Sequence, residues 1–193
     1  LSITYGYFAK EGKGENKHLF IDQHGEILLD YTKRYLVGLG PFGETAVFKK
    51  GPEIIQSTET PYGKIGISIC RDMAFSPFMR QAAQDNVDIM LSPSYDWPKS
   101  PVPWYLLSTL ENGFSFVRPT YNGFTYAADY HGNVLATMDS DETEDGIMYA
   151  DVPTKGIKTL YPIIGDALGW LCVLGLGACV VMAVIGRVRK KHN

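Results

Sequence analysis

Cys70 is the residue with the clearest potential for covalent chemistry. An apolar run at 64–69 predicts a buried strand directly before it, and the polar pair Arg71 and Asp72 follows. Nucleophiles in α/β folds commonly stand at the carboxyl end of such a strand. A buried Cys that only packs as a small hydrophobic residue is the alternative. Its place at a strand end favours the nucleophile.

The partner that such a thiol requires is best supplied by Lys33, at the end of another predicted strand. A thiol becomes a strong nucleophile when a base takes its proton or a nearby cation stabilises the thiolate. A fixed ammonium can also stabilise the oxyanion of a tetrahedral intermediate. The alternative is a solvated surface lysine. We expect the Lys33 ammonium to lie within reach of the Cys70 sulfur.

The elements that must position these residues alternate between strands and helices along the chain. Hydrophobic periodicity predicts strands at 1–8, 18–21, 26–32, 64–69, 87–92, 115–120, 124–129 and 147–152, and helices at 77–85 and 103–112. This order predicts an α/β fold in which helices cover a mixed sheet.

The motif D-x-H-G-x-[IV]-L occurs twice, at 22–28 and at 129–135. Each copy predicts a hairpin turn whose glycine takes a positive φ, which makes His24 and His131 turn residues rather than metal ligands. Two hairpins that share the same turn residues favour a duplicated or pseudo-symmetric sheet. The alternative is that the match over seven residues is due to chance. The sequence contains neither a metal-binding spacing nor a phosphate-binding glycine loop, so no cofactor is expected.

Composition predicts a folded protein with a free thiol. The 193 residues are 45% hydrophobic and 12% aromatic, which is sufficient for a core. Cys172 and Cys179 lie inside a continuous apolar stretch, so Cys70 has no disulfide partner in the globular part. Four of the 18 basic residues follow that stretch, which leaves 14 against 21 acidic residues before it. A nucleic-acid partner is therefore not expected.

The segment 167–186 contains twenty residues without a formal charge. At about 1.5 Å per residue, a helix of this length crosses a hydrocarbon core of roughly 30 Å, so it predicts a transmembrane helix; a buried core helix is the alternative. The basic tail at 187–193 favours the cytoplasmic side and places the globular part on the outer face of a cell membrane. We expect a domain at 1–153 and a linker at 154–166.

Two motifs resemble the nitrilase, or carbon-nitrogen hydrolase, superfamily. The lysine motif Y-x-K followed by P-F-G-E stands at Tyr31, Lys33 and 41–44, and the cysteine motif G-x-x-I-C-[YWR]-[DE]-x-x-F-P stands at 66–72 with Phe75 and Pro77. The stretches SPSYDW and TLENGFSFVRPTYNGFTYAADYHGNVL also look like this family. The resemblance implies an αββα sandwich with a Glu-Lys-Cys triad, here incomplete at its N-terminus.

The resemblance also implies roles for individual residues. Cys70 would be the nucleophile, Lys33 the oxyanion partner and Glu44 a carboxylate that supports the lysine. The backbone N–H of Arg71 would be a further oxyanion donor, and Asp72 would orient its neighbours. Three aromatic residues would line an apolar substrate entrance, with core packing as the alternative: Phe42, Phe75 and Trp97.

The family's general base, a glutamate well upstream of the lysine, has no counterpart that we assign. Only 32 residues precede Lys33, and Glu11, Glu15 and Glu26 fall in predicted loops or turns. We therefore expect the chain to be the C-terminal portion of a longer protein, and to be inactive alone if the base is missing.

Three functions remain open from the sequence. The PFGE motif, the segment 159–166 and the single span resemble the apolipoprotein N-acyltransferases, which implies transfer of a fatty acyl group from phospholipid to a lipoprotein amine through a Cys thioester. The second is a membrane-anchored amidase or nitrilase that acts on a small amide. The third is an inactive ectodomain that binds a ligand.

Overall fold

The computed structural model describes residues 1–38, 41, 43–96, 105–142 and 146–192, with side chains up to Arg187. The chain divides into two compact units, Leu1–Pro162 and Ile163–Asn193. The first unit contains two β-sheets and the second contains one long helix.

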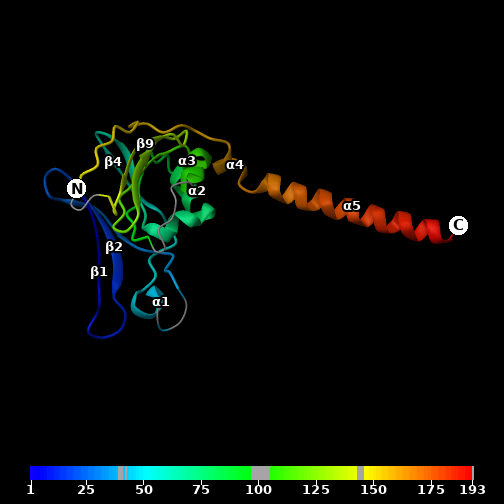
Figure 1. The fold of residues 1–193 in the computed structure, drawn as a ribbon, viewed down its shortest axis with the longest axis horizontal. Helices are drawn as coiled ribbons and strands as arrows, with labels where there is room; N and C mark the ends of the chain where they lie inside the picture. Colours follow the sequence, from blue (N-terminus) through cyan, green and yellow to red (C-terminus); the bar gives the residue numbers. More distant parts are fainter. Residues whose placement is uncertain (39–40, 42, 97–104, 143–145, 193) are drawn as a thin grey trace. The chain divides into compact units, whose positions relative to one another are not determined.

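The smaller sheet is a three-stranded antiparallel meander that ends at Lys33. It consists of β1 (Ser2–Tyr7), β2 (Glu15–Ile21) and β3 (Ile27–Thr32), in the order β1-β2-β3. Leu29 and Tyr31 of β3 are buried, and the residues between and around them are exposed or half-buried. This alternation turns one face of β3 toward the core. Figure 1 shows β1 and β2 side by side in blue.

The larger sheet has six strands and is mixed. Its strands, in spatial order, are β4 (Gln56–Thr60), β5 (Gly63–Ile67), β6 (Ile89–Leu91), β7 (Ser115–Arg118), β8 (Phe124–Ala128) and β9 (Val134–Asp139). The strands β5, β6 and β7 are parallel, and the other pairs are antiparallel. The mixed sheet predicted from the sequence is confirmed. The carboxyl ends of the three parallel strands meet at one edge.

Short helices connect and cover this sheet. They are α1 (Glu44–Val47), the 3₁₀ helix η1 (Cys70–Ala74), α2 (Ser76–Gln84), α3 (Leu106–Asn112) and α4 (Tyr161–Ile164). Helices α2 and α3 lie next to each other (Figure 1). Phe78 and Met79 of α2 are at most 1% exposed and join the core with Ile67 and Phe116 of the sheet. Burial of such side chains stabilises the fold by about 1.5–3 kcal/mol each.

The two hairpin turns predicted from the repeated motif are confirmed. The Asp22 side chain accepts hydrogen bonds from the backbone N–H groups two and four residues later, at 2.8 and 2.9 Å. Asp129 does the same at 2.9 Å for both. Gly25 and Gly132 have φ values of 86° and 76°, as such turns require. Both hairpins are antiparallel pairs with a register shift next to the turn, and β2–β3 belongs to the smaller sheet whereas β8–β9 belongs to the larger one.

Two sequence expectations differ from the structure. The strand predicted at 147–152 is wrong, since this segment is irregular and Ile147 and Tyr149 are 76% and 84% exposed. Alternating apolar residues cannot form a strand without a neighbour that supplies hydrogen bonds. The structure also adds β4, whose polar sequence QSTET gives no strand signal but pairs with β5.

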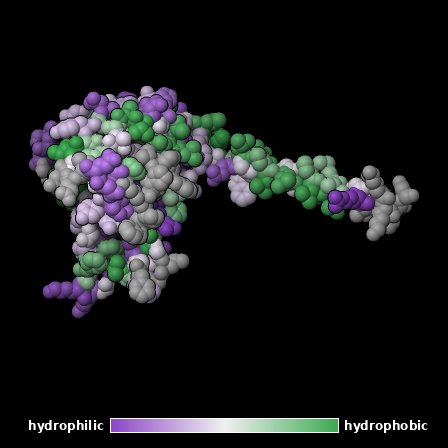
Figure 2. Space-filling model, in the orientation of Figure 1, coloured by the Kyte–Doolittle hydropathy of each residue, from purple (hydrophilic) through white to green (hydrophobic). Residues whose placement is uncertain are grey.

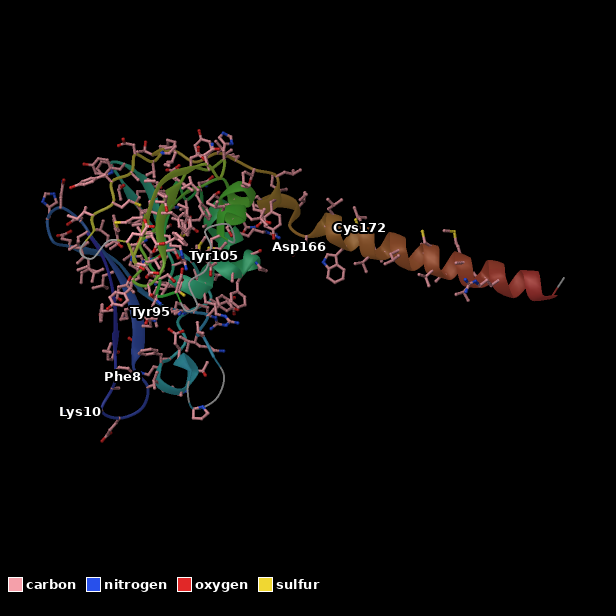
Figure 3. All side chains as sticks on the ribbon, viewed as in Figure 1. Phe8, Lys10, Tyr95, Tyr105, Asp166 and Cys172 are labelled. Carbon is pink, nitrogen blue, oxygen red and sulfur yellow. The ribbon has the colours of Figure 1, made fainter. Side chains whose placement is uncertain are left out.

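The second unit is dominated by α5 (Ala167–His192). Its segment Ala167–Arg187 has a mean hydropathy of 2.5 and is long and apolar enough to cross a membrane. Figure 2 shows hydrophobic side chains over most of this helix, and Cys172 projects from its surface in Figure 3.

Candidate active site

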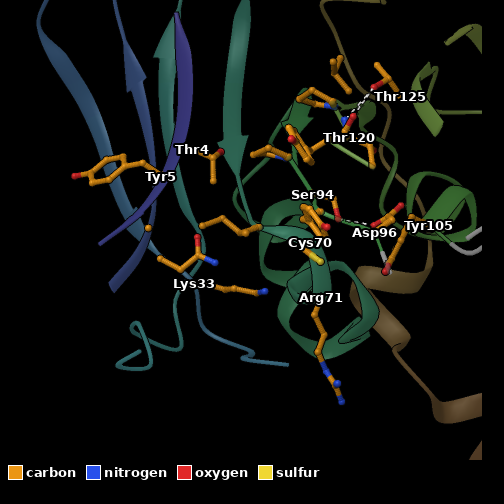
Figure 4. A pocket seen from close by; sticks show the side chains of 18 of the residues that line it. Thr4, Tyr5, Lys33, Cys70, Arg71, Ser94, Asp96, Tyr105, Thr120 and Thr125 are labelled. Atoms are coloured by element: carbon orange, nitrogen blue, oxygen red, sulfur yellow. Dashed lines mark hydrogen bonds between the residues drawn. The ribbon is translucent and has the colours of Figure 1, made fainter. Parts of the chain in front are cut away.

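Cys70 stands at a sharp turn where β5 gives way to η1. Its φ is 50°, a left-handed conformation that costs a non-glycine residue about 1–2 kcal/mol. Ile69 before it is extended, and the Cys70 N–H donates to the Pro93 carbonyl at 2.9 Å. The strand therefore stays buried while the turn presents the half-buried Cys70 side chain to a cavity (Figure 4).

This cavity has a volume of about 1440 Å³ and is lined from both sheets. Lys33, from the end of β3, and Cys70, from the end of β5, both line it, as do Glu44 and Arg71. Figure 4 shows Lys33 and Cys70 in the same view of the cavity. The fold thus places a thiol and an ammonium, 37 residues apart in the chain, on the same cavity.

Lys33 and Glu44 form a close ion pair. The Lys33 Nζ donates to Glu44 Oε1 at 2.9 Å and to Oε2 at 2.7 Å, and the lysine side chain is only 2% exposed. Asn16 Nδ2 donates to Oε1 at 3.0 Å and the Val37 N–H donates to Oε2 at 2.6 Å. Both carboxylate oxygens are therefore occupied, and the ammonium is held in one place.

A backbone contact brings Glu44 back to Lys33. The Glu44 N–H donates to the Val37 carbonyl at 2.8 Å. A Cβ at Gly43 would lie 2.9 Å from both the Val37 oxygen and the Gly38 Cα, and Gly38 has a φ of 80°. Glycines at these two positions permit the close approach that places Glu44 at the first residue of α1.

Asp72 ties the lysine segment to the cysteine turn. This fully buried carboxylate accepts hydrogen bonds from the Tyr31 hydroxyl at 2.7 Å, the Tyr35 N–H at 2.7 Å and the Ile69 N–H at 3.0 Å. Burial raises the pKa of Asp72, and these hydrogen bonds oppose that rise. Tyr31 and Tyr35 each lie two residues from Lys33, so Asp72 fixes this segment against the turn at Cys70.

The remaining aromatic and basic candidates lie in different places. Arg71 is exposed at the cavity, and its guanidinium carbon lies 5.9 Å from the centre of the Phe75 ring. Phe75 stacks on Tyr35 with 3.5 Å between ring centroids and packs against the core. It is absent from the cavity lining that the structure describes. Phe42 and Trp97 lie outside the described residues.

A buried cation behind the cavity lining escaped the sequence reasoning. Arg118, at the end of β7, is 1% exposed and donates through Nη2 to Asp96 Oδ1 and to Ser94 Oγ, both at 2.7 Å. Its guanidinium carbon lies 4.3 Å from the Tyr105 ring centre. Ser94, Asp96 and Tyr105 line the cavity. The sequence signal that could have found this pair is positional. Asp96 lies just beyond the predicted strand 87–92, and Arg118 lies near the end of the predicted strand 115–120.

The carboxylates among the described residues that line the cavity belong to Glu44 and Asp96. Glu11, Glu15 and Glu26 are not part of that described lining, and Glu15 instead accepts a hydrogen bond from Tyr7. Chemically, the site offers a thiol for attack on an acyl carbon and a fixed ammonium for the developing oxyanion.

Comparisons with known proteins identify the family and the fold. A sequence profile of the carbon-nitrogen hydrolase family matches residues 1–161. An apolipoprotein N-acyltransferase of Chlamydia caviae is 28% identical over 187 residues, with 81% of this chain and 34% of the relative covered. A deaminated glutathione amidase of Homo sapiens is 31% identical over 120 residues, with 55% and 37% covered. The chain spans about a third of the length of these two relatives.

Among solved structures, an amidase from a Nesterenkonia species superposes with a TM-score of 0.62 at 19% identity and covers 72% of this chain and 57% of the amidase. A mutant of that amidase carries acrylamide added to its active-site cysteine. This likeness supports the nitrilase-like α/β fold. With the profile match over most of its length, this chain belongs to the carbon-nitrogen hydrolase family.

Proposed function

We propose that Cys70 is the nucleophile of a membrane-bound N-acyltransferase, which takes a fatty acyl group from a phospholipid and transfers it to the N-terminal amine of a lipoprotein. The observation that carries this proposal is the shared cavity, where Cys70 and the Lys33–Glu44 pair lie together. The likeness to apolipoprotein N-acyltransferases supports the choice of reaction.

The reaction has two halves. In the first, the Cys70 sulfur attacks the ester carbonyl of the lipid, a C–S bond forms, and the ester C–O bond breaks. The departing alkoxide takes up the proton that the thiol released, and the lysophospholipid leaves. In the second half, the amine attacks the thioester carbonyl, a C–N bond forms, and the C–S bond breaks. The sulfur recovers a proton that the nitrogen loses.

The surrounding residues stabilise the oxyanion in both halves. Lys33 places its ammonium beside the acyl oxygen, and Glu44 keeps this charge in position through two hydrogen bonds. The backbone N–H of Arg71 is a second oxyanion donor in this proposal. Asp72 acts as a positioning residue, because it holds the lysine segment against the cysteine turn.

The size of the cavity and the apolar helix support a lipid donor. A volume of about 1440 Å³ exceeds the roughly 300–1,000 Å³ of a typical small-molecule pocket. Tyr95, Tyr121 and Ile147 line it with 58%, 81% and 76% of their surfaces exposed, which gives an acyl chain apolar contacts. In this proposal α5 spans the membrane, and the basic end around Arg187 lies in the cytoplasm, with the site outside.

A hydrolase that acts on a small amide is the second candidate. The amidases among the relatives and solved structures favour it. The first half would be the same attack by Cys70 with ammonia or an amine as the leaving group, and water would then cleave the thioester.

One experiment separates the two candidates. The protein is incubated in detergent micelles with phospholipid that carries isotope-labelled acyl chains and with a short peptide that has a free N-terminus. The transferase predicts labelled acyl-peptide, absent in the Cys70→Ala variant. The hydrolase predicts ammonia from a small amide without lipid. Acyl-peptide at an unchanged rate in Cys70→Ala would exclude Cys70 as the nucleophile, and failure of both reactions would leave only ligand binding.

A further inference from the structure

Asp96 is a nearly buried carboxylate on the cavity that the proposed reaction has not used. It is 9% exposed, follows β6, and lines the same cavity as Cys70. Placing a carboxylate in such a position costs free energy, and the ion pair with Arg118 at 2.7 Å offsets that cost. Glu44, the other carboxylate in the described cavity lining, is already engaged, because both of its oxygens accept hydrogen bonds from Lys33 and other donors.

Two neighbours fix one carboxylate oxygen of Asp96, and a third fixes its backbone oxygen. Its Oδ1 accepts from Arg118 Nη2 at 2.7 Å and from Ser94 Oγ at 2.6 Å, and its backbone oxygen accepts from Asn122 Nδ2 at 2.8 Å. Arg118 is held in turn over the Tyr105 ring. Among the residues that the structure describes, no hydrogen-bond donor lies on Asp96 Oδ2. The carboxylate is therefore oriented through Oδ1, and its Oδ2 lies next to Gly123, 3.3 Å from the position that a Cβ on this glycine would occupy.

The segment that carries Asp96 is tied to the nucleophile. The Pro93 carbonyl accepts the Cys70 N–H at 2.9 Å, and the Ser94 N–H donates to the Pro119 carbonyl at 2.9 Å. Tyr105 lines the same cavity as Cys70 and Asp96. Figure 4 shows Ser94, Asp96 and Tyr105 in the same view as Cys70.

We propose that Asp96 is the binding group for the primary amine that accepts the acyl chain, with Oδ2 accepting an N–H hydrogen bond from that amine. The inference rests on the proposed function and deepens it by assigning the nitrogen side of the site. A carboxylate so placed orients the amine with its lone pair toward the thioester on Cys70. Arg118 is the positioning residue, because it fixes the direction of the carboxylate without lining the described cavity.

The test uses Asp96→Asn, which keeps the shape and the Oδ1 acceptor but replaces Oδ2 with an N–H donor. Iodoacetamide alkylation of Cys70 is followed by peptide mass spectrometry in the presence of glycinamide, a small primary amine. N-acetylglycinamide, which lacks the free amine, is the matched ligand control. Glu59→Gln, an exposed carboxylate on β4, is the matched variant.

We expect glycinamide to slow alkylation in the wild type and in Glu59→Gln, and N-acetylglycinamide to have no effect. Half-protection of Asp96→Asn should need roughly 10- to 100-fold more glycinamide, the range for a hydrogen bond to a charged group. Equal protection of wild type and Asp96→Asn, or no protection of the wild type, would overturn the proposal. This readout needs no turnover, so it holds even if the proposed function fails.

A second readout addresses the reaction itself. In Asp96→Asn, acyl transfer from phospholipid to Cys70 should proceed at the wild-type rate, whereas transfer onward to the amine should fall by roughly 10- to 100-fold. Loss of the first half in this variant would contradict a role restricted to the amine. A wild type that forms no acyl-enzyme would count against the proposed function, while the alkylation result would still decide the amine site.

Discussion

Removal of the Tyr31 hydroxyl tests the link between the lysine segment and the cysteine turn. Tyr31→Phe keeps the buried ring but deletes the hydrogen bond of 2.7 Å to Asp72. A hydrogen bond to a charged group contributes about 1.5–3 kcal/mol, and one to a neutral group about 0.5–1.5 kcal/mol. We therefore expect the loss of unfolding free energy to depend on whether Asp72 is ionised.

The sign of this pH dependence follows from the raised pKa of Asp72. Between its ordinary pKa of about 3.9 and its higher folded-state value, the folded protein holds a proton that the unfolded chain has released. The stability from this group is thus present at low pH and is lost as the pH rises through that window. The Tyr31 hydroxyl lowers the pKa of Asp72. Its removal therefore widens the pH range between the unfolded-state and folded-state pKa of Asp72, and increases the unfolding free energy that is lost at higher pH.

The assay is urea unfolding of the chain in detergent micelles, followed by near-ultraviolet circular dichroism between pH 4 and pH 8. Tyr31→Phe should be destabilised by about 0.5–1.5 kcal/mol at the acid end and by about 1.5–3 kcal/mol at the alkaline end. Tyr62→Phe, whose side chain is 68% exposed, is the control and should change little. A loss that does not vary with pH, or that matches the control, would refute the reasoning.

Three further outcomes are expected. Lys33→Met should lower kcat for acyl transfer by roughly 10²–10³-fold with little change in KM. A Lys33→Met/Glu44→Gln double variant should be no slower than Lys33→Met, because the two residues act as a unit. Additive losses in the double variant would contradict this. Burial lowers the pKa of His18 to about 4 from 6.5, so stability should fall as the pH falls through this range. His18→Gln should flatten that fall by up to about 3 kcal/mol, whereas the exposed His131→Gln should not. The chain should stay with membranes through alkaline carbonate extraction and be released when 167–187 is deleted; release of the intact chain would argue against a span.

The turn at Cys70 was predictable because its determinants are local. An apolar strand followed by a polar turn is visible in thirteen residues, and the structure places Cys70 three residues after the end of β5, at the start of η1. The hairpin turns share this property, since Asp22 and Asp129 bond to backbone groups within four residues. Lys33 and Glu44 likewise lie within a stretch of only twelve residues.

The Asp96–Arg118 pair could not be predicted in the same way. These residues are 22 positions apart and meet only because β6 and β7 are adjacent parallel strands. The order of strands in a sheet depends on long-range packing, which hydrophobic periodicity along the chain does not encode. The same reason explains β4, whose polar residues form a strand because β5 supplies hydrogen bonds.

The central claim is that Cys70 captures an acyl carbon in the cavity that it shares with Lys33. The most direct measurement is peptide mass spectrometry of the protein after brief incubation with labelled phospholipid. We predict a hydroxylamine-sensitive acyl adduct on the peptide that contains Cys70, strongly reduced in Lys33→Met. An adduct confined to Cys172 or Cys179, or a Cys70 adduct that forms at the same rate without the lysine, would contradict the account.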